Sequence, residues 1–231
     1  MCGILGGNNF NDIQEVKNGL ASIMHRGTDG NVIFHFEKND FYMSHNRLSI
    51  QDLSESANQP LISENEKFVL AFNGEMWKPF FRKFNNKLRK KYNFKTERSD
   101  SELLLYYLID NRDNILEAMK NLDGMFCFAF YDVERNQLTL GRDFIGRLPL
   151  YYAFENEKIV FSSEVKGLQS ANKELKFFNV DRNRKAPKGE EEKIKVVEPG
   201  TIVTVSENLI GVTNCEIKRW NDFKPEFNPE N

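Results

Sequence analysis

The chain has 231 residues and a formal net charge of −2, from 32 Lys and Arg against 34 Asp and Glu. Hydrophobic residues make up 40% and charged residues 29%, an ordinary globular composition that argues against disordered, collagenous and membrane classes. The near-zero charge offers no global attraction to nucleic acid or anionic lipid, so we expect neither a nucleic acid partner nor a membrane. A chain of this length can bury roughly 70% of its unfolded surface and needs no disulfide or metal to fold.

The cysteines and the N-terminus bear on the cellular compartment. Cys2, Cys127 and Cys215 form no C-x-x-C pair and no disulfide framework, which favours a reducing cytoplasm. No apolar run approaches the ~20 residues of a membrane span. The first residues also lack the basic and apolar regions of a signal peptide.

The first half of the chain alternates between helix and strand patterns. Apolar residues recur at helical spacing over 13–26, and Gly27 follows as a stop. Strands are predicted over 32–36, 41–50 and 67–72, and Asn73-Gly74 after the third is a strong turn signal. Helices are predicted over 79–92 and over 112–121. Between them another helix is predicted, which carries residues 103–108 and is capped by Ser99 or Asp100.

The second half is a series of strands. The run 125–132 alternates with two apolar faces, Phe126, Phe128 and Phe130 on one side and Cys127 among the residues on the other, which predicts a strand buried between two layers. Further strands are predicted over 137–142, 148–154, 158–162, 201–205 and about 209–218, with a short helix over 164–170. Residues 172–195 contain few apolar residues and predict an exposed loop, and 221–231 predict a frayed tail after a domain over 1–220.

Many antiparallel strands with separately grouped helices indicate an α+β layered domain. The two apolar faces of the run 125–132 favour two sheets stacked on each other, with the helices outside.

Cys2 is the first candidate for chemistry. If Met1 is removed, as is usual before a small side chain, the Cys2 thiol and a free α-amine belong to one residue. An α-amine titrates near ~7.7–8.0 and a thiol near ~8.5, so the amine is a plausible base for the thiol. A cysteine at position 2 is also compatible with chance, so the neighbouring motifs decide.

A series of short motifs accompanies Cys2 in order along the chain. They are CGI at 2–4, HRGTDG at 25–30, HNRLSI at 45–50, QPL at 59–61, FNGE at 72–75, SDSE at 99–102, LDGMF at 122–126, GRD at 141–143, GRLPLYY at 146–152 and SSEVK at 162–166. Together they resemble the glutaminase domain of class II glutamine amidotransferases, and most closely that of glutamine-hydrolysing asparagine synthetases. The resemblance implies a four-layer αββα N-terminal-nucleophile hydrolase sandwich of two antiparallel sheets between helix layers.

The resemblance also implies roles for six residues. Cys2 matches the nucleophile that attacks the side-chain amide of L-glutamine to form a thioester and release ammonia. The Asn73 amide and the Gly74 N–H match the oxyanion donors, and a donor of this kind is typically worth ~2.7–4 kcal/mol. Arg47 matches the clamp on the α-carboxylate. Glu75 and Asp100 match the groups that hold the α-ammonium.

Other polar residues are expected to be structural. Arg26, Asp29, Arg142 and Asp143 are expected to form buried or semi-buried pairs that brace the site, and Cys127 is expected to be inert core. The three histidines lack metal-ligand spacing, and we expect no metal and no cofactor. The basic residues between 82 and 95 fit the solvated face of a helix, or a docking face for a partner or a nucleic acid.

The sequence departs from the family in two ways. Thr28 and the run Met76-Trp77-Lys78 differ from the usual residues, which puts the local loop rigidity and cleft shape in question. No Ser-Gly-Gly-x-Asp-Ser loop and no Walker motif occurs, so we expect ammonia to pass to a separate ATP-dependent, synthetase-like partner. The expected docking surfaces are 172–195 and a sheet edge near 201–205.

Three alternatives stay open at this point. The first is an N-terminal-nucleophile hydrolase that cuts another amide, which Arg47, Glu75 and Asp100 argue against. The second is a Cys–His hydrolase that uses Cys127 or Cys215, neither of which has a suitable motif around it. The third is a non-catalytic regulatory subunit, which the complete set of candidate residues disfavours.

Overall fold

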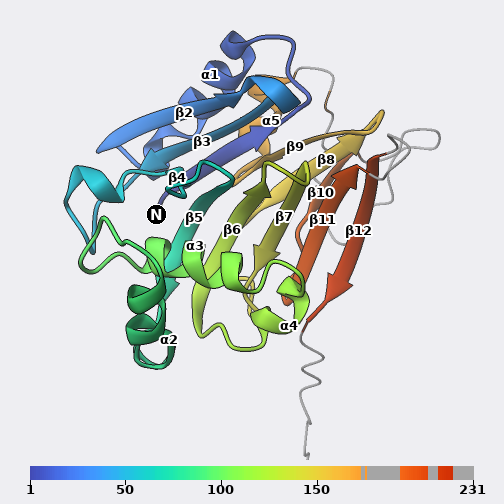
Figure 1. Ribbon diagram of the computed structural model, residues 1–231. Coiled ribbons are helices and arrows are strands. Elements are labelled where there is room, and N and C mark those ends of the chain that lie inside the picture. The colour runs from blue at the N-terminus through green and yellow to red at the C-terminus, as the bar shows by residue number, and fades with distance from the viewer. Residues whose placement is uncertain (173–174, 176–192, 208–212, 221–231) are drawn as a thin grey trace, which may run out of the picture.

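The computed structural model describes residues 1–172, 175, 193–207 and 213–220. Within these residues two six-stranded sheets lie face to face, and every strand pair is antiparallel (Figure 1). The first sheet runs in the order β10 (Ile194–Val196), β8 (Tyr151–Glu155), β9 (Lys158–Ser162), β1 (Gly3–Gly7), β3 (Phe41–Arg47) and β2 (Gly30–Phe36). The second runs in the order β12 (Thr213–Arg219), β11 (Thr201–Glu207), β7 (Gln137–Arg142), β6 (Gly124–Asp132), β5 (Phe68–Met76) and β4 (Leu61–Ile62).

Helices cover the outer faces of both sheets. The helices α1 (Ile13–Ser22) and α5 (Val165–Ala171) lie on the first sheet, and α2 (Lys78–Lys91), α3 (Asp100–Asp110) and α4 (Ile115–Met119) lie on the second. Three short 3-10 turns complete the described elements: Met24–Arg26, Glu37–Asn39 and Glu55–Ala57. The result is the four-layer αββα sandwich that the resemblance implied.

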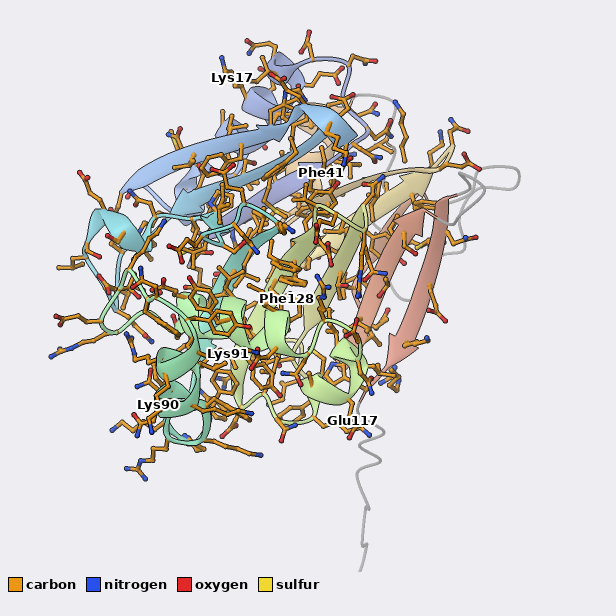
Figure 2. The ribbon with its side chains drawn as sticks, viewed as in Figure 1. Lys17, Phe41, Lys90, Lys91, Glu117 and Phe128 are labelled. Atoms are coloured by element: carbon orange, nitrogen blue, oxygen red, sulfur yellow. The ribbon has the colours of Figure 1, made fainter. Side chains whose placement is uncertain are left out.

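Three apolar clusters hold the four layers together. The cluster between the sheets includes Phe41 and Cys127, whereas the cluster under α2–α4 includes Phe126 and Phe128. The third cluster fills the space between the first sheet and the helices α1 and α5. In Figure 2 Phe41 and Phe128 point into the body of the molecule, while Lys17, Lys90 and Glu117 lie at its periphery. The two apolar faces of 125–132 are therefore confirmed as the two faces of a central strand.

Local sequence explains where the helices begin. Asp12 accepts hydrogen bonds from the Gln14 and Glu15 N–H groups at the start of α1, and Ser99 accepts from Glu102 N–H at the start of α3. Of the two caps considered for α3, Ser99 is thus the observed one. Pro79 stands in the first turn of α2, where a missing N–H costs nothing.

Several predicted boundaries are wrong. The Asn73-Gly74 turn does not exist, because β5 continues through both residues to Met76, paired with β6. The first helix ends at Ser22 and continues only as a 3-10 turn, with Ile13 and Met24 exposed. The strand predicted over 41–50 ends at Arg47, and the one over 148–154 begins at Tyr151.

Two predictions about the end of the domain also need correction. The exposed loop over 172–195 lies mostly outside the described residues, but Ile194 is buried in β10. The strand β11 is not a sheet edge, since it pairs with β7 on one side and β12 on the other. The tail over 221–231 lies outside the described residues. No described helix combines the length and apolar character required to cross a membrane.

Candidate active site

One pocket, with a volume of about 140 Å³, collects all six residues predicted for the site. Cys2, Arg47, Asn73, Gly74, Glu75 and Asp100 all line it. They come from the residue before β1, the end of β3, the last part of β5 and the first turn of α3. The face-to-face packing of the two sheets brings these elements together, with β1 and β3 in one sheet and β5 in the other.

The Cys2 thiol is held by the backbone of the residue after β3. Its Sγ accepts a hydrogen bond from Leu48 N–H at 3.4 Å and lies 3.7 Å from the Leu48 carbonyl oxygen. Burial raises the pKa of the Cys2 thiol, against the smaller effects of the Leu48 hydrogen bond and the nearby positive charges. Among the described residues no histidine hydrogen-bonds this thiol: His25 contacts Glu164 and Lys166, and His45 contacts Phe72.

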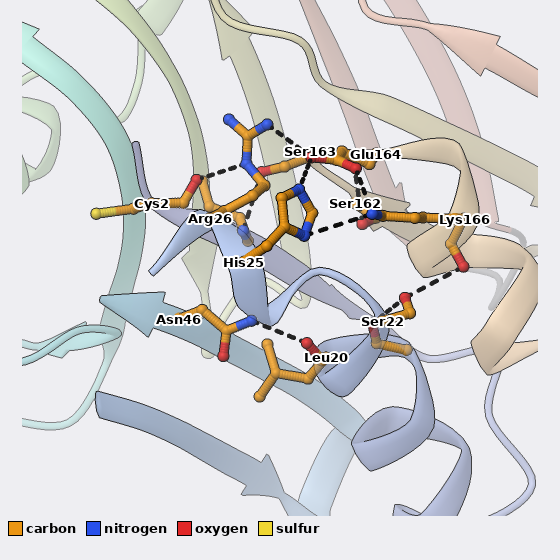
Figure 3. Close-up of polar contacts among 12 residues, drawn as sticks. Cys2, Leu20, Ser22, His25, Arg26, Asn46, Ser162, Ser163, Glu164 and Lys166 are labelled. Atoms are coloured by element: carbon orange, nitrogen blue, oxygen red, sulfur yellow. Dashed lines mark hydrogen bonds and ion pairs between the residues drawn. The ribbon is translucent and has the colours of Figure 1, made fainter. Parts of the chain in front are cut away.

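Arg26 anchors the Cys2 backbone from the opposite side. Its Nε donates to the Cys2 carbonyl oxygen at 2.9 Å, and its Nη1 pairs with Glu164 at 2.9 Å. Glu164 also pairs with His25 at 2.9 Å and Lys166 at 3.3 Å (Figure 3). The N-terminal strand is therefore tied to the loop before α5 by a charged network around one carboxylate.

The four bracing residues do not pair with one another. Arg26 has an ion pair, but its partner is Glu164. Asp29 accepts from Ser49 N–H at 2.7 Å, and Arg142 donates to the carbonyls of Leu148 and Val197 at 2.7 Å each. Asp143 accepts from the N–H groups of Phe126, Ile145 and Gly146. These residues brace loops by binding backbone groups, which a spacing of charges in the sequence does not reveal.

Asn73 and Gly74 occupy strand positions at the floor of the pocket. Gly74 has a φ of +154°, and a Cβ at this position would meet the Met125 carbonyl oxygen at 2.3 Å. Only glycine fits there, because the conformation is rare for L side chains and the partner strand leaves no room. The buried Asn73 side chain donates from Nδ2 toward Cys127 Sγ at 3.9 Å.

Arg47 extends from the end of β3 into the loop that follows. Its guanidinium donates to the carbonyls of Ser54, at 3.0 Å, and Asp52, and to Asn58 Oδ1 at 2.5 Å. Its position in the pocket is thus fixed by residues 52–58, and the residue as a whole is nine-tenths buried. A buried, pre-oriented guanidinium is suited to bind a carboxylate.

The two candidate carboxylates differ in environment. Glu75 is exposed at the rim of the pocket. Asp100 is buried in the first turn of α3 and accepts from Met76 N–H at 3.0 Å. Burial raises the pKa of Asp100 to about 6, although hydrogen bonds from Met76 and Ser101 oppose this shift. A buried carboxylate of this kind gains most from a cation that enters the pocket.

Sequence reasoning missed several groups at the site. The Leu48 N–H is a backbone group and leaves no trace in a motif. Gln59 was recognised only as part of a motif, yet it joins β5 to α3 through two side-chain hydrogen bonds. Within the described residues there is no group of three or more His, Cys, Asp or Glu side chains placed to hold a metal ion.

The chain is similar to proteins named as asparagine synthetases over most of its length. It is 31% identical over 220 residues to asparagine synthetase [glutamine-hydrolyzing] 1 of Bacillus subtilis, covering 89% of this chain and 33% of that protein. It is 34% identical to asparagine synthetase B of Escherichia coli, covering 69% and 27% respectively. It is 28% identical to a putative asparagine synthetase of Methanocaldococcus jannaschii, covering 79% and 38%. The chain thus spans about a third of the length of these relatives.

Solved structures support the fold. A glutamine phosphoribosylpyrophosphate amidotransferase from B. subtilis superposes with a TM-score of 0.69 at 18% identity, covering 96% of this chain and 50% of that chain. A glutamine aminotransferase class-II domain protein from Silicibacter pomeroyi superposes with a TM-score of 0.54 at 11% identity, covering 96% and 100%. The model of the family described as glutamine amidotransferase domain matches residues 1–215. The chain therefore belongs to the glutamine amidotransferase domain family.

Proposed function

We propose that this chain hydrolyses the side-chain amide of L-glutamine through a thioester on Cys2 and supplies the ammonia to a synthetase-like acceptor protein. The observation that carries the proposal is the pocket itself. A thiol, an amide donor beside a glycine N–H, a guanidinium and two carboxylates line one small cavity. This set matches the groups of a free amino acid whose side chain ends in an amide.

The first half of the reaction forms the thioester. The Cys2 thiol gives up its proton, and Sγ attacks the δ-carbonyl carbon of glutamine. The carbonyl oxygen becomes an oxyanion, which the Asn73 Nδ2–H and the Gly74 N–H stabilise. Collapse of this intermediate breaks the C–N bond, and the proton taken from the thiol leaves with the amine as ammonia.

The second half releases glutamate. A water molecule gives a proton to the same base and attacks the thioester carbonyl carbon, with the oxyanion held by the same two donors. The C–S bond then breaks and Sγ recovers a proton. One base and one pair of donors therefore serve both half-reactions, as in other covalent hydrolases.

The α-amine of Cys2 is the proposed base, which requires removal of Met1. Burial raises the pKa of the thiol, so the thiol needs a base close by. No described histidine hydrogen-bonds the thiol, as noted above, whereas the α-amine of the same residue is always within reach. Its usual pKa of roughly 7.7–8.0 suits proton transfer near neutral pH.

Selectivity for a free amino acid follows from the charges around the pocket. Arg47 binds the α-carboxylate, and Asp100 with Glu75 binds the α-ammonium. Residues 52–58 hold the guanidinium in place, so little side-chain entropy is lost when substrate arrives.

The acceptor is proposed to be a synthetase domain or protein that activates its substrate with ATP. The relatives named above are about three times longer than the matched region, and their names describe glutamine-dependent asparagine synthesis. The cytoplasm is the proposed compartment, since all three cysteines are free thiols.

The decisive experiment measures glutamate and ammonia release from L-glutamine by protein whose intact mass shows loss of Met1. In a second sample, an additional residue at the N-terminus keeps Met1 from being removed, so Cys2 has no free α-amine. The expected result is activity in the first sample and none in the second. Equal activity in both would remove the α-amine from the mechanism. Hydrolysis of another amide, with no release from glutamine, would assign the pocket to a different substrate.

A further inference from the structure

The peptide groups of Phe72 are held by two side chains at the point where β5 enters the pocket. Phe72 N–H donates to Gln59 Oε1 at 2.6 Å, and the Phe72 carbonyl accepts from His45 Nε2 at 3.2 Å. Phe72 directly precedes Asn73 and Gly74. Both contacts are buried, so water does not compete for either group.

Gln59 provides a hydrogen bond to β5 just beyond the end of the strand β4. The β4–β5 ladder pairs Ile62 with Val69 and Leu61 with Leu70. Extending this register by two residues would place Gln59 opposite Phe72, but the ladder ends at Leu61. The side chain of Gln59, instead of its backbone, accepts the hydrogen bond from Phe72 N–H. This backbone donor at the edge of β5 therefore keeps a hydrogen-bond partner beside the pocket.

His45 reaches Phe72 from the opposite sheet. It lies in β3, between Ser44 and Asn46, and is fully buried. Because the Phe72 carbonyl can only accept, His45 carries a proton on Nε2 in this contact. Burial lowers the pKa of His45 to about 4, which keeps this tautomer uncharged at neutral pH. The contact fixes the spacing between the sheet of Cys2 and the sheet of Asn73.

Gln59 also connects β5 to the helix of the ammonium site. Its Nε2 donates to Ser101 Oγ at 3.2 Å, and Ser101 adjoins Asp100 in the first turn of α3. One side chain thus links the strand of the oxyanion donors to the helix of the buried carboxylate.

We propose that Gln59 and His45 are positioning residues that clamp the Phe72 peptide groups and thereby align the Asn73 and Gly74 oxyanion donors with Cys2. This inference rests on the proposed glutaminase function. Neither residue needs to touch substrate. Their effect is on transition-state stabilisation, because a misplaced donor binds a developing oxyanion poorly while ground-state binding is retained.

The test compares variants that remove one hydrogen bond from β5 at different places. Gln59→Met removes the acceptor of Phe72 N–H at nearly constant volume. Ser63→Ala is the matched control, since Ser63 Oγ accepts from Phe68 N–H at 3.0 Å on the same strand, four residues further from the donors. His45→Leu removes the second contact, and His45→Gln restores a donor close to the position of Nε2.

The measurements are kcat and KM for glutamine, the melting temperature, and the rate at which iodoacetamide alkylates Cys2. We expect Gln59→Met and His45→Leu to lower kcat roughly 10- to 100-fold, the cost of a small misalignment. KM changes less than kcat, alkylation stays at the wild-type rate, and His45→Gln recovers part of kcat. Ser63→Ala lowers the melting temperature comparably but keeps the wild-type kcat.

A wild-type kcat in Gln59→Met, or an equal loss of kcat in Ser63→Ala, would overturn the proposal. If His45→Leu does not fold, the Gln59→Met and Ser63→Ala pair decides alone. If the wild type fails to hydrolyse glutamine, the proposed function fails separately, and hydrogen exchange of the Asn73 and Gly74 amides then tests the clamp. Faster exchange in Gln59→Met than in Ser63→Ala supports the clamp, and equal exchange refutes it.

Discussion

Cys2 lines the same pocket as Asn73 and Cys127 contacts the Asn73 side chain, but the surroundings of the two cysteines differ. Cys2 opens into the pocket and is held by the Leu48 backbone. Cys127 lies between the sheets, fully buried, and contacts the Pro149 carbonyl and the Asn73 amide. Burial raises the pKa of both thiols, to about 12 for Cys127. Burial alone therefore does not distinguish a nucleophile from a core cysteine.

The difference lies in what each thiol can reach. In the proposed mechanism Cys2 has a cavity for substrate, a neighbouring oxyanion site and, once Met1 is removed, its own amine as base. Cys127 has none of these, although its sulfur touches the same Asn73 side chain. Asn73 thus lines the pocket of Cys2 and also contacts the buried Cys127.

The largest effect is expected from Cys2→Ala, which removes the nucleophile and abolishes glutamate release. Cys215→Ala is the control, since Cys215 lies on the strand β12 and does not line the pocket. Glutamate release is measured for both variants against wild type. Residual turnover in Cys2→Ala, or its loss in Cys215→Ala, would contradict the assignment.

Alkylation should separate the two thiols directly. We expect iodoacetamide to modify Cys2 in the native protein and to leave Cys127 unmodified, because Cys127 is fully buried and its thiol pKa lies at about 12. Peptide mass spectrometry after timed labelling reads out both sites. Labelling in denaturant is the control and should modify both. Native labelling of Cys127 at the rate of Cys2 would show that the reagent reaches the space between the two sheets.

Asn73→Ala is expected to lower kcat by roughly 10²–10³ with little change in KM, since an oxyanion donor acts in the transition state. Steady-state kinetics with glutamine measure this split. A rise in KM at constant kcat would instead place Asn73 in substrate binding.

Arg47→Ala is expected to act in the opposite way and mainly raise KM, because a carboxylate clamp works in the ground and transition states alike. Arg47→Lys should recover part of the affinity for glutamine, but not the bidentate hydrogen bonding to its α-carboxylate. The guanidinium also holds residues 52–58, so circular dichroism is used to confirm that the variants fold. A fall in kcat with unchanged KM would contradict the clamp.

The smallest effect is a pH dependence of affinity. The pKa of Asp100 is raised to about 6, so the carboxyl is protonated below that pH and cannot pair with the substrate ammonium. KM for glutamine should therefore rise as the pH falls through about 6, by up to tenfold per pH unit. In Asp100→Asn, KM should be high and nearly independent of pH over this range. A wild-type KM that stays constant from pH 5 to pH 8 would exclude Asp100 from ammonium binding.

The same pKa shift has a consequence for folding. A carboxyl whose pKa is higher in the folded than in the unfolded chain favours folding while it is protonated, and this contribution is lost as the pH rises through about 6. Asp100 thus opposes folding at neutral pH unless a cation occupies the pocket. The proposed role of Asp100 in ammonium binding accounts for a carboxyl that costs stability.

Much of the fold was predictable because its signals are local. The run 125–132 shows two apolar faces, and β6 has one face in each of two cores. Ser99 stands one residue before a helix and caps it. The Asn73-Gly74 turn signal failed for a tertiary reason. Pairing with β6 continues from Asn73 opposite Cys127 to Met76 opposite Gly124, and this long ladder overrides the local turn preference.

Motifs in a fixed order along the chain identify the family and, with it, the six candidate site residues. How these residues meet depends on the tertiary structure. Cys2 and Arg47 come from one sheet, Asn73 and Gly74 from the other, and Asp100 from the helix α3. It also decided that Arg26 pairs with Glu164 and that Gln59 and His45 hold Phe72. Periodicity reports which face of an element is apolar, whereas these contacts depend on how two sheets pack, and no local pattern encodes that distance.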